Sequence, residues 1–207
     1  RGATDNRSGR RVAGMRILAG KASSPEKPPQ IRKGRLQVSN SARMTIFAEN
    51  GANMEIDLTI EQAGLQEPIP YELLYEADPS REAVADYIAR GTCYIARLGG
   101  RTVGVSVLLR TRPFTMELVN LCVAEPYRRQ GIATRLIAHA AERARAAKCR
   151  ILEVGTGNAG IGQLALYQRC GFSIESIEKD YFVRHYPEPI YENGIECRDM
   201  VRLRMEL

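Results

Sequence analysis

The stretch EPYRRQGIATRLIAHAAERARAA, residues 125–147, contains a loop that runs without a break into a helix. Three long polar residues, Arg128, Arg129 and Gln130, precede a lone Gly131, which is more than a simple reversal of direction requires. The first turn of a helix has amide groups without internal partners, the helix dipole adds positive charge there, and glycine lets the backbone come close to a ligand. We therefore expect an anion site with the amides of residues 129–134 as donors. An ordinary left-handed turn with solvated arginines is the alternative.

Two common phosphate-binding loops are excluded at this junction. The triphosphate loop G-x-x-x-x-G-K-[ST] is absent from the sequence, and G-x-G-x-x-G does not occur in this turn. The expected anion is therefore bound by a different kind of loop.

The basic charge of the chain is concentrated in its first 43 residues. This segment holds eleven of the 30 Lys and Arg residues but only two of the 24 acidic ones, so it carries +9 and the remainder carries −3. It has no helical or strand periodicity, so we expect a poorly ordered arm. The arm is either a functional basic tail or a non-native extension that precedes a natural start at Met44 or Met54. The negative charge of the remaining residues and the lack of aromatic stacking motifs argue against a nucleic-acid partner.

The composition predicts one soluble domain in a reducing compartment. Hydrophobic content of 44% and charged content of 26% in 207 residues suit a single hydrophobic core. No apolar stretch approaches the ~20 residues that cross a bilayer, and a secretory signal core is absent from the arm. The five cysteines are odd in number and contain no C-x-x-C pair, so we expect free thiols and a cytoplasmic location.

The pattern along the chain predicts a mixed α/β domain. We expect Asp78 or Ser80 to cap the second helix, Gly91 to end it, and Gly99-Gly100 to form a hairpin turn. The expected strands are 54–61, 92–98, 101–110, 115–123, 149–157, 173–184 and 199–207, and the expected helices are 71–77, 78–91, 132–147 and 161–171.

Two motifs in this order resemble the GNAT acetyltransferase superfamily. RRQGIA at 128–133 is similar to its [QR]-x-x-G-x-[GA] signature, and LALYQRCGF at 164–172 is similar to its L-Y-x-x-x-G-F. The resemblance covers about residues 54–207 and is strongest to small bacterial members. It implies a mixed, mostly antiparallel sheet that splays between the fourth and fifth strands, with helices on both faces. It also implies acetyl-CoA as cosubstrate, held by its pyrophosphate on the loop, and no metal.

The resemblance implies a set of cofactor-binding residues. The backbone of the fourth strand would contact pantetheine and the thioester, and the loop would bind the pyrophosphate. The family's asparagine and alanine ahead of the tyrosine are Gly160 and Gln163 here, so Asn158 is proposed instead as a pantetheine contact. The full set is Leu121, Cys122, Val123, Arg128, Arg129, Gln130, Gly131, Ile132, Ala133, Thr134 and Asn158.

Two residues match catalytic positions of the family. Tyr167 would be the general acid toward the coenzyme A thiolate, although a core tyrosine on an amphipathic helix is the alternative. Glu117 lies fourteen residues ahead of Gly131 and would draw the ammonium proton through a water; a solvent-facing carboxylate or a pair with Arg110 is the alternative. Glu153 is the second candidate base. A nucleophilic Cys122 is disfavoured because no histidine is near in sequence.

The expected function is direct acetyl transfer from acetyl-CoA to the primary amine of a small molecule. The segment DYFVRHYPEPIYENGIECRD, 180–199, is dense in aromatic and acidic residues and could line an acceptor pocket for an aminoglycoside or polyamine-like cation, or form a polar hairpin. A protein or peptide acceptor and a catalytically idle acyl-CoA-binding regulatory module are the rival functions. We expect no membrane partner, and a homodimer is left open.

Overall fold

The computed structural model describes residues 43–47, 53–64 and 66–207, and for residues 43–47 and 53–56 it describes the backbone alone. The chain divides into two units, Arg1–Gln30 and Ile31–Leu207, and all described residues belong to the second. The elements are β1 (Arg43–Phe47), β2 (Asn53–Gln62), α1 (Tyr71–Ala77), α2 (Arg81–Arg90), β3 (Thr92–Leu98), β4 (Arg101–Arg112), β5 (Thr115–Val123), a 3-10 turn (Glu125–Tyr127), α3 (Ile132–Ala146), β6 (Ile151–Gly157), α4 (Ile161–Arg169), β7 (Ser173–Glu178), α5 (Tyr181–His185), β8 (Ile190–Glu192), β9 (Ile195–Cys197) and β10 (Met200–Glu206).

Eight strands form one sheet in the order β1-β2-β3-β4-β5-β6-β10-β7. Among the described strands β5 and β6 pair in parallel and every other pair is antiparallel. The parallel ladder is short, because it begins at Thr115 with Ile151 and ends at Leu118 with Val154. Beyond that point β5 stays on β4 and β6 stays on β10, so the sheet splits between β5 and β6. The predicted fold class, including the splay between the strands 115–123 and 149–157, is confirmed.

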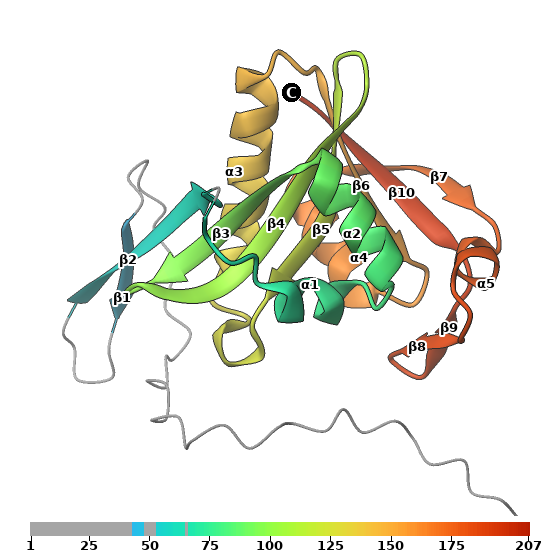
Figure 1. The fold of residues 1–207 in the computed structure, drawn as a ribbon, viewed down its shortest axis with the longest axis horizontal. Helices are drawn as coiled ribbons and strands as arrows, with labels where there is room; N and C mark the ends of the chain where they lie inside the picture. Colours follow the sequence, from blue (N-terminus) through green and yellow to red (C-terminus); the bar gives the residue numbers. More distant parts are fainter. Residues whose placement is uncertain (1–42, 48–52, 65) are drawn as a thin grey trace, which may run out of the picture. The chain divides into compact units, whose positions relative to one another are not determined.

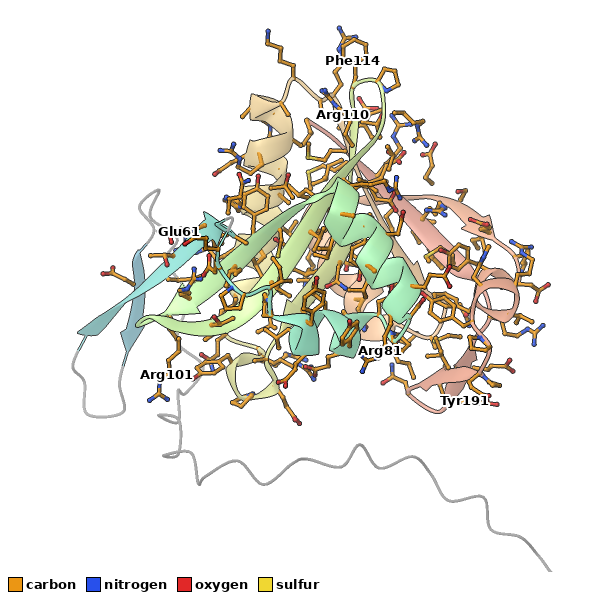
Figure 2. The ribbon with its side chains drawn as sticks, in the orientation of Figure 1. Glu61, Arg81, Arg101, Arg110, Phe114 and Tyr191 are labelled. Atoms are coloured by element: carbon orange, nitrogen blue, oxygen red, sulfur yellow. The ribbon has the colours of Figure 1, made fainter. Side chains whose placement is uncertain are left out.

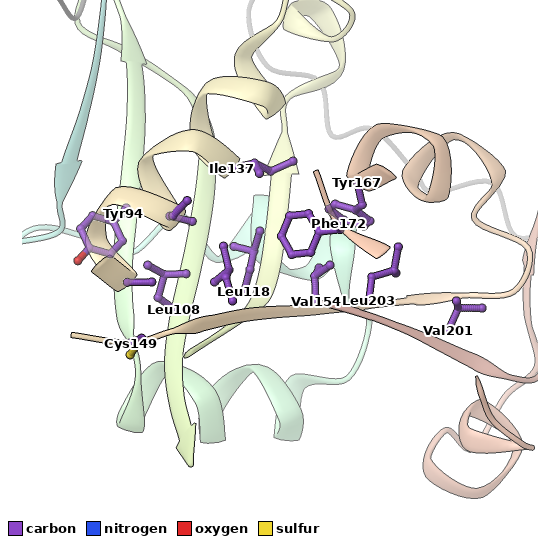
Figure 3. Close-up of a cluster of buried hydrophobic side chains, with 14 residues drawn as sticks. Tyr94, Leu108, Leu118, Ile137, Cys149, Val154, Tyr167, Phe172, Val201 and Leu203 are labelled. Atoms are coloured by element: carbon purple, nitrogen blue, oxygen red, sulfur yellow. The ribbon is translucent and has the colours of Figure 1, made fainter. Parts of the chain in front are cut away.

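Helices cover both faces of the sheet, as predicted (Figure 1). Helices α3 and α4 pack on one face, where Leu118, Leu152 and Leu203 meet Ile137 and Tyr167 in a buried cluster (Figure 3). Helices α1 and α2 pack on the other face through a second cluster that contains Leu74, Val84 and Cys122. Because successive strand residues alternate between faces, Glu117, Glu153 and Arg202 lie on the face opposite to α3 and α4.

A β-bulge bends β5 where the sheet begins to split. Leu118 pairs with Leu108 and Asn120 pairs with Val107, which leaves Val119 as the extra residue on β5. A bulge disrupts the ladder and turns the strand. It also puts Val119 and Asn120 on the same face of the sheet, the one that α1 and α2 cover. Val119 packs in the α1–α2 cluster, and Asn120 donates to the Leu74 carbonyl of α1.

Most local predictions hold, and the C-terminal part departs from them. Ser80 caps α2 by accepting from the Ala83 amide, and the turn at Gly99-Gly100 has the expected positive φ at both residues. The strand expected over 173–184 is wrong in its second half, because Asp180 takes a left-handed φ of 53° and α5 follows. Strands β1, β8 and β9 were not predicted. The N-terminal arm, 1–43, lies outside the described residues apart from Arg43, and the domain boundaries stay predictions.

Candidate active site

The loop between β5 and α3 presents a run of unpartnered amides. The Arg128 amide still bonds to the Glu125 carbonyl, and the Arg135 amide makes the first helical bond, to Gly131. Within the described residues, the amides of residues 129–134 between them have no acceptor. Two left-handed residues, Arg129 with φ 63° and Gly131 with φ 84°, shape this run ahead of the helix. Such a concave run of N–H groups at a helix start is the donor set that a diphosphate requires.

The Arg128 side chain ties the loop to β5 and α1. Its Nε donates to the Val123 carbonyl oxygen at 2.9 Å, and its Nη2 pairs with Glu76 of α1. Its charge is therefore compensated, whereas the Arg129 side chain is exposed. The Gln130 side chain donates to the Pro126 carbonyl at 3.2 Å and braces the same loop. The site thus depends on backbone amides more than on the two arginines, and phosphate binding by these residues stays a prediction.

The end of β5 offers backbone groups to the split. The Ala124 amide bonds to the Val103 carbonyl near the start of β4, so the backbone groups of residue 124 face β4. Because N–H and C=O groups alternate in direction along a strand, the groups of Leu121 and Val123 point away from β4 into the split, and those of Cys122 point toward β4. The predicted pantetheine contacts are therefore favoured at Leu121 and at the Val123 amide, because the Val123 carbonyl already accepts from Arg128. Cys122 is buried, and burial with the nearby Glu76 carboxylate raises the thiol pKa to about 12, so the thiol stays protonated.

Tyr167 approaches the split from the α3–α4 face. Its side chain is 6% exposed and its ring packs edge-on against Phe172, with 5.8 Å between centroids (Figure 3). Its hydroxyl has no hydrogen-bond partner among the described residues. Burial, with smaller contributions from Cys170 and Glu192, raises the pKa of Tyr167, so the phenol keeps its proton. A protonated phenol without an internal acceptor can donate to a thiolate, although the residue is also part of the core.

Glu117 approaches from the opposite face and lines a pocket of about 510 Å³ with Glu153 and Arg202. Its carboxylate lies 3.5 Å from Arg202 Nη1. The pairing with Arg110, which the sequence left as an alternative, is not formed. Arg110, labelled in Figure 2, donates instead to the Ala147 carbonyl that follows α3. Burial raises the pKa of Glu117 and Glu153 adds to this, while Arg202 and Arg112 oppose it. A carboxyl with a raised pKa inside a pocket is suited to general base chemistry.

Buried polar contacts around α1 and α2 were missed by sequence reasoning. Asn120 is 4% exposed, and its Nδ2 donates to the Leu74 carbonyl at 3.1 Å and to the Tyr87 hydroxyl at 2.8 Å. The Tyr186 hydroxyl of the segment after α5 donates to Asp78 at 3.0 Å, and burial raises the pKa of Asp78. The signal in the sequence was a lone asparagine in the apolar run ELVNLCV.

Asn158 is occupied by the chain itself. Its side-chain oxygen accepts from the amides of Arg198 and Asp199 at 2.8 and 2.9 Å, and its Nδ2 donates to the Glu196 carbonyl at 3.1 Å. These bonds fix the segment between β9 and β10 to the end of β6. Pantetheine could use only the hydrogen-bonding capacity of Asn158 that these three bonds leave free. The contact with pantetheine stays a prediction, and the segment between β9 and β10 competes for the same side chain.

Tyr167 packs in the same cluster as Leu118 and Val154, the last pair of the β5–β6 ladder, and Glu117 precedes that pair on the opposite face of the sheet. The loop with the amide run follows β5, one of the two strands that separate there. Glu153, the second candidate base, pairs with Arg112 in the same pocket. Within the described residues, no group of His, Cys, Asp and Glu side chains is arranged to hold a metal ion, and no helix is both long and apolar enough to cross a membrane.

The chain is similar to known acetyltransferases. The model of the acetyltransferase (GNAT) family matches residues 60–172. The uncharacterized N-acetyltransferase YvbK of Bacillus subtilis is 50% identical over 137 residues, which are 66% of this chain and 88% of that protein. An IAA acetyltransferase from Bacillus cereus is 53% identical, with a TM-score of 0.70 over 72% of this chain and 99% of that one. A GNAT family acetyltransferase from Elizabethkingia anophelis with acetyl-CoA bound is 43% identical, with a TM-score of 0.71 over 72% and 98%.

Proposed function

The chain belongs to the GNAT acetyltransferase family and is an N-acetyltransferase that uses acetyl-CoA, and from this premise we propose that its acceptor is the primary amine of a small molecule. The observation that carries the proposal is the pocket of about 510 Å³ beside Glu117, which is the size of a small-molecule site. It lies on the face of the sheet opposite to Tyr167, so acceptor and thioester would approach the split from opposite faces. An aminoglycoside or polyamine-like cation is one class of acceptor that this proposal includes.

The amide run supports the binding of the cosubstrate. Six consecutive N–H groups at the start of α3 offer more donors than a single phosphate can use, and the dipole of a 15-residue helix favours negative charge there. Leu121 and Val123 would hold the pantetheine and thioester groups through their backbone. Acetyl-CoA supplies the activated acetyl group when bound, and the chain orients it.

Glu117 would prepare the amine. An ammonium group cannot attack a carbonyl carbon, so its proton must first leave, and a carboxylate with a raised pKa takes that proton directly or through a water. The amine nitrogen then bonds to the acetyl carbon while the carbon–sulfur bond breaks. An amide of the split end of β5 that points at the carbonyl oxygen would stabilise the charge that develops on it.

Tyr167 would complete the proton balance. The leaving sulfur carries the negative charge of the broken bond, and the Tyr167 phenol would donate a proton to it. The nitrogen, positively charged after its attack, releases its second proton to solvent, and solvent returns one proton to the Tyr167 phenolate. The proton taken at Glu117 returns to solvent from the acceptor pocket. Direct transfer of this kind leaves no acyl group on the protein, in agreement with the protonated, buried thiol of Cys122.

We also propose a cytoplasmic location. All five cysteines, in the described part of the chain, are free thiols, which suits a reducing compartment.

A thiol-release assay tests the proposed acceptor class. The full chain is incubated with acetyl-CoA and, in separate reactions, with polyamines, aminoglycosides, amino acids and short peptides, and the acetylated product is identified by mass spectrometry. Turnover of small amines above the rate of acetyl-CoA hydrolysis is the expected result. Turnover of peptides alone would favour a protein acceptor, and tight acetyl-CoA binding without turnover of any amine would favour the regulatory module.

A further inference from the structure

The acceptor pocket carries equal numbers of positive and negative side chains. Three arginines and three glutamates line it: Arg112, Arg202, Arg204, Glu117, Glu153 and Glu175. Arg112 pairs with Glu153, and Arg204 pairs with Glu175 at 3.4 Å. A polycation would meet these arginines as well as the carboxylates, so the charge of the pocket does not favour an acceptor that is purely cationic.

Arg202 has hydrogen-bonding capacity to spare. Its Nε and Nη2 both donate to Glu178 Oε2, at 3.3 and 2.9 Å, which uses one side of the guanidinium. Its Nη1 lies 3.5 Å from Glu117 Oε1, in an ion pair that is not a hydrogen bond. The ring of Tyr181 lies 5.8 Å from the guanidinium carbon and helps to hold its plane. A guanidinium has five N–H groups, so the end formed by Nη1 and Nη2 can still receive a carboxylate in a two-pronged contact.

Arg202 and Glu117 also lie where the sheet opens. Leu118 and Val154 form the last pair of the β5–β6 ladder. Glu117 precedes that pair, and Arg202 pairs with Gly155, the first β6 residue beyond it. A ligand held by Arg202 is therefore placed at the apex of the split, next to the candidate base.

We propose that the acceptor is an α-amino acid or a close analogue, with Arg202 binding its carboxylate and Glu117 facing its amine. One carbon separates the two groups of such an acceptor, and the 3.5 Å between Glu117 Oε1 and Arg202 Nη1 places a receptor for each charge side by side. The amine displaces water at Glu117, and the carboxylate takes the free end of the guanidinium. This inference rests on the proposed function and narrows its substrate class.

The test compares acceptors that differ only in the carboxylate. Each common amino acid is assayed with acetyl-CoA and the full chain beside its carboxamide and its decarboxylated amine. The wild type is expected to prefer the acid. In Arg202→Met, kcat/KM for the acid is expected to fall by roughly ten- to a hundredfold more than kcat/KM for the carboxamide and the amine. A smaller loss common to all three acceptors accompanies it, because Arg202 lowers the pKa of Glu117 and its removal leaves less of the base deprotonated. Arg202→Lys keeps the charge but not the two-pronged geometry of the guanidinium. Its kcat/KM for the acid is expected to lie between those of the wild type and Arg202→Met.

The ratio of acid to amine within one variant does not depend on how much of the protein is folded. Thermal melting and acetyl-CoA binding check the fold of each variant separately. Arg198→Met is the matched control, because Arg198 is an exposed arginine that pairs with Asp180 and Glu196 outside the pocket, and its acid preference should equal that of the wild type.

The outcomes separate this inference from the proposed function. Equal or better turnover of the amine than of the acid by the wild type overturns the amino acid proposal and leaves a small-molecule amine acceptor standing. An equal loss for all three acceptors in Arg202→Met also overturns it, because Arg202 would then only position Glu117. If acetyl-CoA binds and no small amine is acetylated, both proposals are overturned.

Discussion

Gly131 is the residue on which the amide run depends most directly. Its φ of 84° lies in the left-handed region, where a side chain costs about 1–2 kcal/mol for most residues and less for aspartate. It occupies the N-cap position of α3 without a side-chain bond to the helix. In the variant Gly131→Asp, the carboxylate would come within reach of the amides of Ala133 and Thr134, the usual partners of an N-cap side chain. The variant therefore puts a negative charge where the diphosphate would bind and occupies two of its donors.

The loss of affinity follows from those two donors. Hydrogen bonds to charged groups contribute about 1.5–3 kcal/mol each, so losing two weakens acetyl-CoA binding by about 3–6 kcal/mol, or roughly a hundredfold to ten-thousandfold. Calorimetry with acetyl-CoA measures this change directly. Thermal melting gives a second readout, because a ligand that binds the folded state raises Tm. The wild type should melt higher with acetyl-CoA, and Gly131→Asp should show little shift.

Gly100→Asp is the matched control for this experiment. Gly100 has a φ of 80°, lies in the β3–β4 turn, and a side chain there would meet nothing within 4 Å. The control adds the same charge in a similar backbone conformation but with no helix amides beside it, so it should leave acetyl-CoA affinity unchanged. Unchanged affinity in Gly131→Asp, or an equal loss in Gly100→Asp, would refute the reasoning.

Three further variants test the chemistry and the scaffold. Tyr167→Phe should lower kcat by roughly a hundredfold or more while acetyl-CoA affinity and Tm stay near those of the wild type, because the hydroxyl has no internal partner; full turnover in steady-state kinetics would show that the proton comes from elsewhere. For the wild type, kcat/KM should fall as pH drops through the raised pKa of Glu117, since the base is the deprotonated form. Glu117→Gln should reduce the rate most strongly between the pKa of Glu117 and that of the amine, where the wild type has a carboxylate and the amine still carries its proton, and the fall at low pH should disappear; an unaltered pH profile would exclude Glu117 as the base. Asn120→Ala should lower the free energy of unfolding by about 2–3 kcal/mol in a urea titration, because it leaves the buried Leu74 carbonyl without its side-chain donor and the Tyr87 hydroxyl without a partner; a loss below about 0.5 kcal/mol would contradict this role.

The loop and the caps could be predicted because they depend on neighbours in the chain. A glycine in the left-handed region is favoured at position 131 by its missing Cβ, whatever packs around it. Ser80 caps α2 because its hydroxyl lies three residues from the amide that it bonds. The alternation of apolar and polar residues also predicted most strands of the sheet, because a strand with one buried face has an apolar residue at every second position.

The C-terminal segment shows where local pattern was insufficient. Residues 173–184 alternate well enough to suggest one strand, yet the chain turns at Asp180 and forms α5. Contacts from distant segments hold it there: Arg198 and Asp199 bond to Asp180, and Tyr186 bonds to Asp78 of the α1–α2 connection. A preference of a few tenths of a kcal/mol per residue is easily overridden by such contacts.

The amino-acid sequence alone predicted the glycine turn ahead of α3 and most of the strands, because glycine conformation and hydrophobic period are properties of short stretches, and the motif resemblance predicted the splayed sheet. Only the tertiary structure decided which charges meet. Glu117 pairs with Arg202, 85 positions away, instead of Arg110. The Asn158 carboxamide donates to the Glu196 carbonyl and accepts from the amides of Arg198 and Asp199. Those partners are set by the register of β5, β6 and β10, which follows from packing the whole core and cannot be deduced from any one strand.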